Sequence, residues 1–152
     1  MDGLVVASGT EANGFRAYTQ LFRSGVLEFM RVYGPQGDQL YVPSGEYEQL
    51  LMRNLSNGLG VLRDLGFGPP VFLTLSLVNA RGYRLGVGQH TRFYVSEPRP
   101  FERDVMVPDV ELTSLVVDAA SVLRTLFDYV WNAAGYRGSL NYDENGNWHV
   151  NP

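Results

Sequence analysis

Alternating apolar and polar positions dominate the first part of the chain and predict β-strands. The run GLVVA near the N-terminus is short and β-branched, and FRAYTQLF places Phe15, Ala17, Thr19 and Leu21 on one side. After the loop RSG, VLEFMRVY alternates again. Two β-rich runs around a short glycine-containing loop predict a hairpin. A brief extended piece, LYVP, follows and closes at Pro43.

Helical spacing first appears after this extended piece and predicts a long helix that ends at Gly66. Ser44 is a suitable N-cap, and an acidic residue such as Glu48 suits the first turn of a helix. Gly58 and Gly60 each weaken the helix by about 1 kcal/mol relative to alanine, so they either permit close packing or mark a bend. The apolar stripe consists of Tyr47, Leu50, Leu51, Leu55, Leu59, Leu62 and Leu65.

A second helix is predicted from about Leu115 to Ala134. Arg124 and Asp128 have the i,i+4 spacing of an ion pair on its polar side. Gly135 is expected to supply the left-handed residue that ends the helix. The buried stripe is expected to contain Ala119, Leu123, Leu126, Phe127, Val130, Trp131 and Ala134.

The segments between the two helices predict strands. VFLTLSLV is the most apolar run and is expected to be a central strand buried on both faces. YRLGVG reads as the return strand after the turn NARG, and TRFYV as a continuation of the sheet. Because Pro108 interrupts VMVPDVEL, this run can be only an edge or irregular strand.

The C-terminal segment SLNYDENGNWHV predicts a tight hairpin in which Gly146 takes a positive φ. Tyr142 and Trp148 would then face each other across the loop, with Trp148 covering the end of the preceding helix. Helices and strands do not alternate regularly along the chain. The predicted fold class is therefore α+β, with a mostly antiparallel sheet packed against two main helices and a C-terminal β-hairpin, in one globular domain of residues 1–152.

Composition narrows the class of protein. Apolar residues make up 45% and charged residues 18% of the 152 residues, as in globular domains. No apolar stretch approaches the length of a membrane span and the N-terminus lacks the pattern of a signal peptide, so a cytoplasmic location without membrane contact is expected. The chain has neither cysteine nor lysine, which excludes disulfides, thiol catalysis and lysine nucleophiles.

Charge is unevenly distributed, although the net charge is only −4. Residues 81–103 hold five arginines against two glutamates, and residues 104–128 hold five acidic residues against one arginine. This pattern fits a solvated surface with internal pairing or a basic contact patch for nucleic acid. The five arginines are Arg81, Arg84, Arg92, Arg99 and Arg103.

Sequence motifs for chemistry are missing. The short glycine motifs do not continue into a phosphate-binding loop, and there is no GxSxG nucleophile elbow. His90 and His149 are isolated, and DENGNWH departs from a calcium loop because its glycine sits at the fourth position. The sequence therefore assigns no catalytic residue, no cofactor and no metal ligand, and favours a protein without enzymatic activity.

The aromatic residues of the tail have two interpretations. They could stack nucleic-acid bases beside Arg137, or they could pack on the last helix, which is the favoured reading. Asn132 and Arg137 are the polar residues most suited to a role other than folding. The candidate contact surface consists of Arg81, Arg84, Arg92, Asn132, Tyr136, Arg137, Tyr142 and Trp148.

Several segments together carry a family resemblance. They include DGLVVA, GVLEFMRV, LGFGPPVFLTLSLVNARGYRL, VMVPDVEL and, above all, LFDYVWNAAGYRGSLNYDENGNW. These segments resemble the C-terminal region of bacterial proteins that carry a Schlafen-type AlbA domain at the N-terminus and are described as ATP-binding or DNA-binding, transcriptional-regulator-like proteins.

The AlbA-type domain, to which the nucleotide or nucleic-acid function of that family is assigned, is missing from this sequence, so none of its residues can be transferred. The resemblance implies a non-catalytic accessory module that contacts a protein partner, its own N-terminal domain or a second copy. The alternative is a nucleic-acid-binding accessory domain that uses the arginine patch and the C-terminal aromatic residues.

Overall fold

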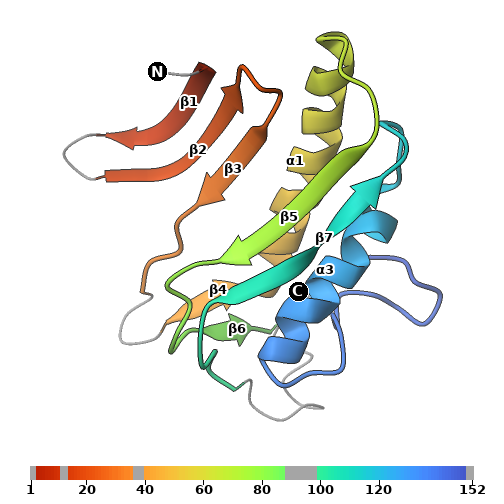
Figure 1. Cartoon of the computed structure of the whole chain (residues 1–152). Helices are drawn as coiled ribbons and strands as arrows, with labels where there is room; N and C mark the ends of the chain where they lie inside the picture. The colour runs from red at the N-terminus through yellow and green to blue at the C-terminus, as the bar shows by residue number, and fades with distance from the viewer. Residues whose placement is uncertain (1–2, 11–13, 36–39, 88–98, 150–152) are drawn as a thin grey trace.

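The fold is α+β, as the sequence predicts (Figure 1). The computed structural model describes residues 3–10, 14–35, 40–87 and 99–149. Its elements are β1 (Gly3–Thr10), β2 (Gly14–Phe22), β3 (Leu27–Arg31), β4 (Tyr41–Pro43), α1 (Ser44–Asp64), β5 (Val71–Leu77), β6 (Arg84–Gly86), β7 (Val105–Leu112) and α3 (Ala119–Ala133).

The first three strands form an antiparallel sheet in the order β1-β2-β3, which confirms the predicted hairpin between β2 and β3. The sheet packs on α1 at Gly58, where an added Cβ would lie 2.8 Å from Leu27 Cδ2 and 3.2 Å from Phe29 Cζ. Around Gly60 there is nothing within 4 Å of an added Cβ. Gly58 is therefore the glycine that permits close packing.

The middle strands differ from the prediction. β5 pairs with β7 and alternates between half-buried and exposed residues, so the expectation of a central strand buried on both faces was wrong. β6 does not return along β5; it pairs in parallel with β4, in a separate sheet. The predicted strand TRFYV lies outside the described residues. The edge or irregular strand predicted from Pro108 is confirmed, since β7 pairs with β5 in a two-stranded sheet and the β5–β7 register shifts beside Pro108.

Both helices end in the predicted way but differ at their starts. Gly66 and Gly135 have φ of +82° and +92°, and the following N–H groups donate back to the last helical turn, as in a Schellman motif. α1 begins at Ser44 without a side-chain cap. α3 begins at Ala119, four residues later than predicted, because the Asp118 side chain accepts the Ala120 N–H and caps the helix there.

The core lies between the two helices and the inner faces of the strands (Figure 1). Every residue of the predicted α3 stripe is buried, and Trp131 has no exposed surface. From the strands, Val105, Val107 and Leu112 of β7 join the same cluster. α3 therefore packs as the sequence predicts.

Candidate functional site

A completely buried glutamate, Glu48, is the polar centre of the described molecule. It lies on the face of α1 that points into the core, one turn after the buried Ser44 and two turns before the buried Leu55. An ionised carboxylate in such a place is costly unless donors surround it. The surroundings of Glu48 therefore decide what it can do.

Four strong hydrogen bonds surround this carboxylate. Oε1 accepts from Trp131 Nε1 at 2.7 Å and from Ser139 Oγ at 2.8 Å. Oε2 accepts from Asn141 Nδ2 at 2.9 Å and from Trp148 Nε1 at 2.7 Å. We call these five residues the Glu48 cluster.

The Glu48 cluster ties the tail to the rest of the fold. A carboxylate offers about four lone-pair directions, and each oxygen already has two short partners. The Tyr47 hydroxyl adds a longer contact at 3.3 Å, and burial, followed by the Glu48 charge, raises the pKa of Tyr47 well above its ordinary value. With its acceptor positions filled by protein donors, Glu48 acts as an anchor for residues 139–148 rather than as a base for an incoming substrate.

The tail differs in detail from the predicted hairpin. A single bridge joins Tyr142 and Trp148, which confirms that they are opposed, and Gly146 has the expected positive φ of +83°. Trp148 donates to Glu48, the carboxylate that Trp131 in the last turn of α3 also binds. The tail also reaches the start of that helix, since the Tyr142 hydroxyl donates to the Ala120 carbonyl at 2.6 Å.

The ion pair predicted between Arg124 and Asp128 is replaced by contacts of both side chains with the tail. Arg124 lies over the Tyr142 ring, 5.1 Å from its centroid, rather than against Asp128. Asp128 Oδ1 instead accepts the Ser139 N–H at 2.7 Å. Burial, and then the Glu48 charge, raises the pKa of Tyr142 above its ordinary value. The face of α3 that was expected to carry a solvent-exposed ion pair therefore receives the tail.

The remaining aromatic and amide candidates also make internal contacts. The Tyr136 ring packs edge-on against Trp131 with centroids 5.2 Å apart, and Asn132 Nδ2 donates to the Tyr136 carbonyl at 3.1 Å. Together with Tyr142 and Trp148, these residues hold the end of α3 and the tail. The packing interpretation accounts for their observed contacts, and Arg137 stays exposed beside them.

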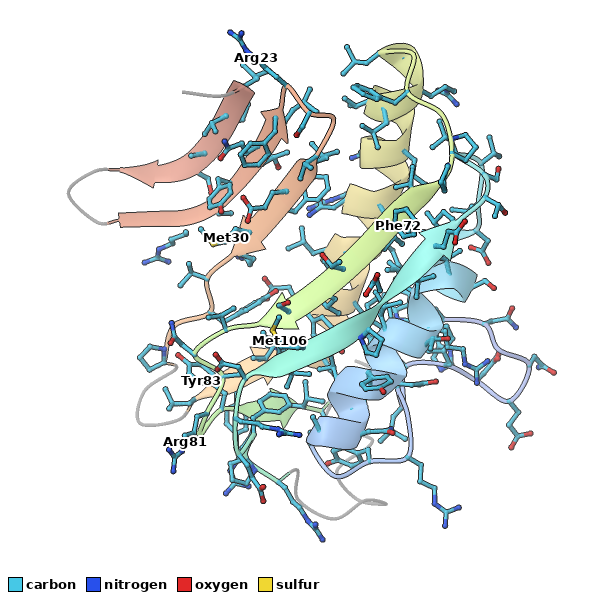
Figure 2. The ribbon with its side chains drawn as sticks, viewed as in Figure 1. Arg23, Met30, Phe72, Arg81, Tyr83 and Met106 are labelled. Carbon is cyan, nitrogen blue, oxygen red and sulfur yellow. The ribbon has the colours of Figure 1, made fainter. Side chains whose placement is uncertain are left out.

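The candidate arginines gather at one end of the molecule, although they are far apart in sequence. The Gly82 N–H donates to the Phe101 carbonyl at 2.9 Å, which joins the segment with Arg81 and Arg84 to residues 99–103. The Arg99 N–H donates to the Ala134 carbonyl at 3.0 Å and so reaches the C-terminal end of α3. Figure 2 shows Arg81 at this end. Arg92, the remaining arginine of the candidate surface, lies outside the described residues.

The described ranges of the chain contain no group of three or more histidine, aspartate or glutamate residues placed to hold a metal ion. In the DENG loop, the backbone and side-chain N–H groups of Asn147 bind Asp143 and hold its pKa below the ordinary value. Neither described helix has the length and apolar character that a membrane crossing requires.

Exposed apolar side chains mark two surfaces. On the outer face of β5 and β7, Phe72 is 60% and Met106 is 70% exposed, and Figure 2 shows both on the side of these strands turned to the viewer. On β1, Leu4 and Val6 are each 66% exposed. We call the first surface the β5–β7 outer face and the second the β1 edge.

Comparison with protein-family models, with curated proteins and with solved structures found no match.

The Glu48 cluster was not predicted from the sequence, although a signal was present. Glu48 falls on the same helical stripe as Leu51, Leu55 and Leu62, so an acidic residue interrupts the face expected to be buried. Two tryptophans and an asparagine later in the chain supply N–H donors, but their proximity to α1 depends on the fold.

Proposed function

We propose that this chain is a non-catalytic interaction module that binds a protein partner through the β5–β7 outer face. The observation that carries the proposal is the pair of large apolar side chains, Phe72 and Met106, that project from this face. They lie at opposite ends of the strand pair, since Phe72 is opposite Glu111 and Met106 is opposite Ser76. Large apolar side chains exposed on one strand surface favour a binding role for that surface. Phenylalanine and methionine are also among the residue types enriched at protein interfaces.

The sequence of β5 supports this assignment. Its outward positions Phe72, Thr74 and Ser76 alternate with half-buried apolar residues, so the outer face mixes apolar and hydroxyl groups on a regular strand surface. On β7, Met106 lies directly opposite Ser76. Backbone pairing of the two strands holds these side chains at set positions, which reduces the entropy lost when a partner binds.

The closed Glu48 cluster is consistent with a non-catalytic role, because its buried carboxylate has its acceptor positions filled by protein donors. The resemblance of the tail to Schlafen-type AlbA-domain proteins supports a role as an accessory module in a protein of that kind. A cysteine-free chain is in keeping with a reducing compartment, and we place the module in the cytoplasm as part of this proposal.

A photo-crosslinking experiment tests the proposed surface. Phe72 and Met106 are replaced, one at a time, by p-benzoylphenylalanine, and the variants are expressed in the native host and irradiated. Val116 is the matched control, since it is an exposed apolar residue outside the β5–β7 outer face. We expect the same discrete protein adduct from positions 72 and 106 and not from position 116. No adduct, or the same adducts at all three positions, contradicts the proposal.

A second candidate function, nucleic-acid binding, is favoured by the clustering of arginines at one end of the molecule. Backbone hydrogen bonds bring the Arg81 segment, residues 99–103 and the C-terminal end of α3 together. Arg137 follows that helix end and is exposed. Phosphate groups bind such basic surfaces with an affinity that falls as the salt concentration rises.

Fluorescence anisotropy with labelled single- and double-stranded DNA and RNA tests this candidate at about 50 mM salt and at higher salt. We expect the double variant Arg81→Ser, Arg137→Ser to weaken binding and flatten its salt dependence. Arg16→Ser, on the distant strand β2, is the control and leaves both unchanged. Absence of binding by the unmodified chain at low salt rejects this function.

A further inference from the structure

Within the described part of the chain, the outer edge of β1 has no strand partner. There β1 pairs with β2 along one side only, and its sequence GLVVASGT contains no charged residue and no proline. Proteins usually protect exposed edges with lysine, proline, bulges or short strands. β7 has such protection, since it carries Pro108, Asp109, Glu111 and a register shift. The regular part of β1, Gly3–Ala7, has none.

The hydrogen-bond pattern fixes which backbone groups point outward. The bonds from the Phe22 N–H to Val26 and from the Val32 N–H to Arg16 show that the even-numbered residues of β2 bond to β3. Odd-numbered residues of β2 therefore bond to β1, because antiparallel pairs alternate. Their partners are the even-numbered residues of β1. The N–H and C=O groups of Gly3, Val5 and Ala7 consequently face away from the sheet.

We propose that a second copy of this chain pairs with the β1 edge in antiparallel orientation, about a two-fold axis that passes between Val5 and Val5 of the second copy. This proposal rests on the proposed role as an interaction module, but it uses a different surface and names the partner. Val5 would exchange two backbone hydrogen bonds with Val5 of the second copy. On each side of the axis, Gly3 of one copy would exchange two more with Ala7 of the other. The two three-stranded sheets would become one continuous sheet.

The side chains fit this register on both faces. A two-fold axis perpendicular to the sheet keeps each side chain on its own face, so opposed residues must differ by an even number. With Val5 at the axis, Leu4 faces Val6 of the second copy on the α1 side. Leu21, the partner of Leu4 on β2, extends this apolar row. A register centred on Val6 would instead bring in the irregular position at Ser8, where the β1–β2 pairing shifts.

A second copy is the occupant that the charge and register of β1 favour. The chain carries a net charge of −4, so two copies repel except where they meet through uncharged surfaces such as Gly3–Ala7 of β1. The same stretch is self-complementary, because Leu4 faces Val6 of the second copy when Val5 lies at the axis.

Charge reversal at the axis tests the pairing and its register together. Unmodified protein is examined by sedimentation velocity at several micromolar concentrations, and we expect a dimer of twice 17.0 kDa. Val5→Lys and Val5→Glu each place like charges opposite each other, and we expect the dissociation constant to rise at least about tenfold. An equimolar mixture of the two variants should associate again. Val26→Lys, a charge at another exposed valine, should leave the dimer unchanged.

Disulfide crosslinking is a second test, and it does not depend on weakening the dimer. Opposed residues of a hydrogen-bonded antiparallel pair have Cα atoms about 5.5 Å apart, within the disulfide range. Because the chain has no cysteine, Val5→Cys offers one thiol, and we expect it to form a covalent dimer under mild oxidation while Val26→Cys does not.

A monomer at every concentration, or a Val5→Lys variant that dimerises like the unmodified chain, overturns the proposal. So does a charge-reversed mixture that fails to associate. These failures leave the crosslinking result at positions 72 and 106 unaffected, so the two proposals can be judged separately.

Discussion

Replacing Glu48 with glutamine tests the anchor role of the Glu48 cluster, since it changes one oxygen to an NH₂ group and keeps the side-chain shape. Each Glu48 oxygen accepts two hydrogen bonds of 2.7–2.9 Å from Trp131, Ser139, Asn141 and Trp148. In either orientation the new NH₂ group faces one indole N–H that loses its acceptor, from Trp131 or Trp148, because the Ser139 hydroxyl can rotate and the Asn141 amide can turn to accept from the NH₂ group. A buried donor without a partner costs about 1–3 kcal/mol.

This loss is a substantial part of the usual stability of a domain, about 5–15 kcal/mol. For a chain of this length each kcal/mol lowers the melting temperature by about 2–4 °C, so a loss of about 2 kcal/mol lowers it by roughly 4–8 °C. Differential scanning calorimetry at neutral pH measures the shift, and chemical denaturation measures the free energy of unfolding.

Glu46→Gln is the matched control, because Glu46 is two residues away and pairs with Arg31 at 3.2 Å on the surface. Surface ion pairs of this kind contribute about 0–1 kcal/mol. If Glu48→Gln melts as the control does, the carboxylate is not holding the tail and the anchor assignment is wrong.

Three further predictions concern stability. Trp131→Ala should lower the free energy of unfolding by about 3–5 kcal/mol in denaturant titrations. Arg137→Ala, at an exposed position, should change it by only a few tenths of a kcal/mol. Equal effects would show that the buried stripe is misassigned. Gly60→Ala should raise the free energy of unfolding by up to about 1 kcal/mol, because alanine favours the helix and the site is open. Gly58→Ala should not raise it, because the added methyl group would collide with side chains of β3. A similar gain at both sites would refute the close contact. Burial raises the pKa of Tyr33 to about 12 from an ordinary value of 10.0. Its contribution to the free energy of unfolding is therefore complete below pH 10 and is lost as the pH rises towards 12. Tyr33→Phe should therefore soften the alkaline loss of stability, and an unchanged pH profile would argue against this residue as the cause.

The two helices could be predicted because their signals are local. Apolar residues recur at helical spacing, and Gly66 and Gly135 occupy the left-handed position that ends each helix. The α3 start was predicted too early, since the residues before Asp118 continue an apolar pattern and only the cap at Asp118 ends it.

Strand partners could not be predicted with the same success. The run VFLTLSLV is apolar enough for either a strand covered on both faces or one with an exposed apolar face. The structure has the second arrangement, with Phe72 exposed. The pairing of β6 with β4 is non-local and depends on how α1 brings the two strands together, which no short pattern records.

The candidate contact surface stays a prediction. The packing role favoured for the tail aromatics agrees with their internal contacts, but Glu48 was treated as a residue that suits the start of a helix. Whether a glutamate on an apolar stripe is exposed or anchored depends on donors far along the chain. Here those donors are 83 to 100 residues away, so local pattern alone could not reveal them.

The long sequence separation within the Glu48 cluster means that its hydrogen bonds can form only late in the synthesis of the chain. α1 leaves the ribosome long before Trp131, Ser139, Asn141 and Trp148, so its carboxylate must stay hydrated until nearly the whole chain has emerged. Bringing such distant residues together is slow, because loop closure costs entropy before the contacts form. A nascent chain that stalls before Trp148 would bury a carboxylate with too few donors or leave α1 undocked. Proteases that digest such unfinished chains and spare the finished one would then act as a check on completion.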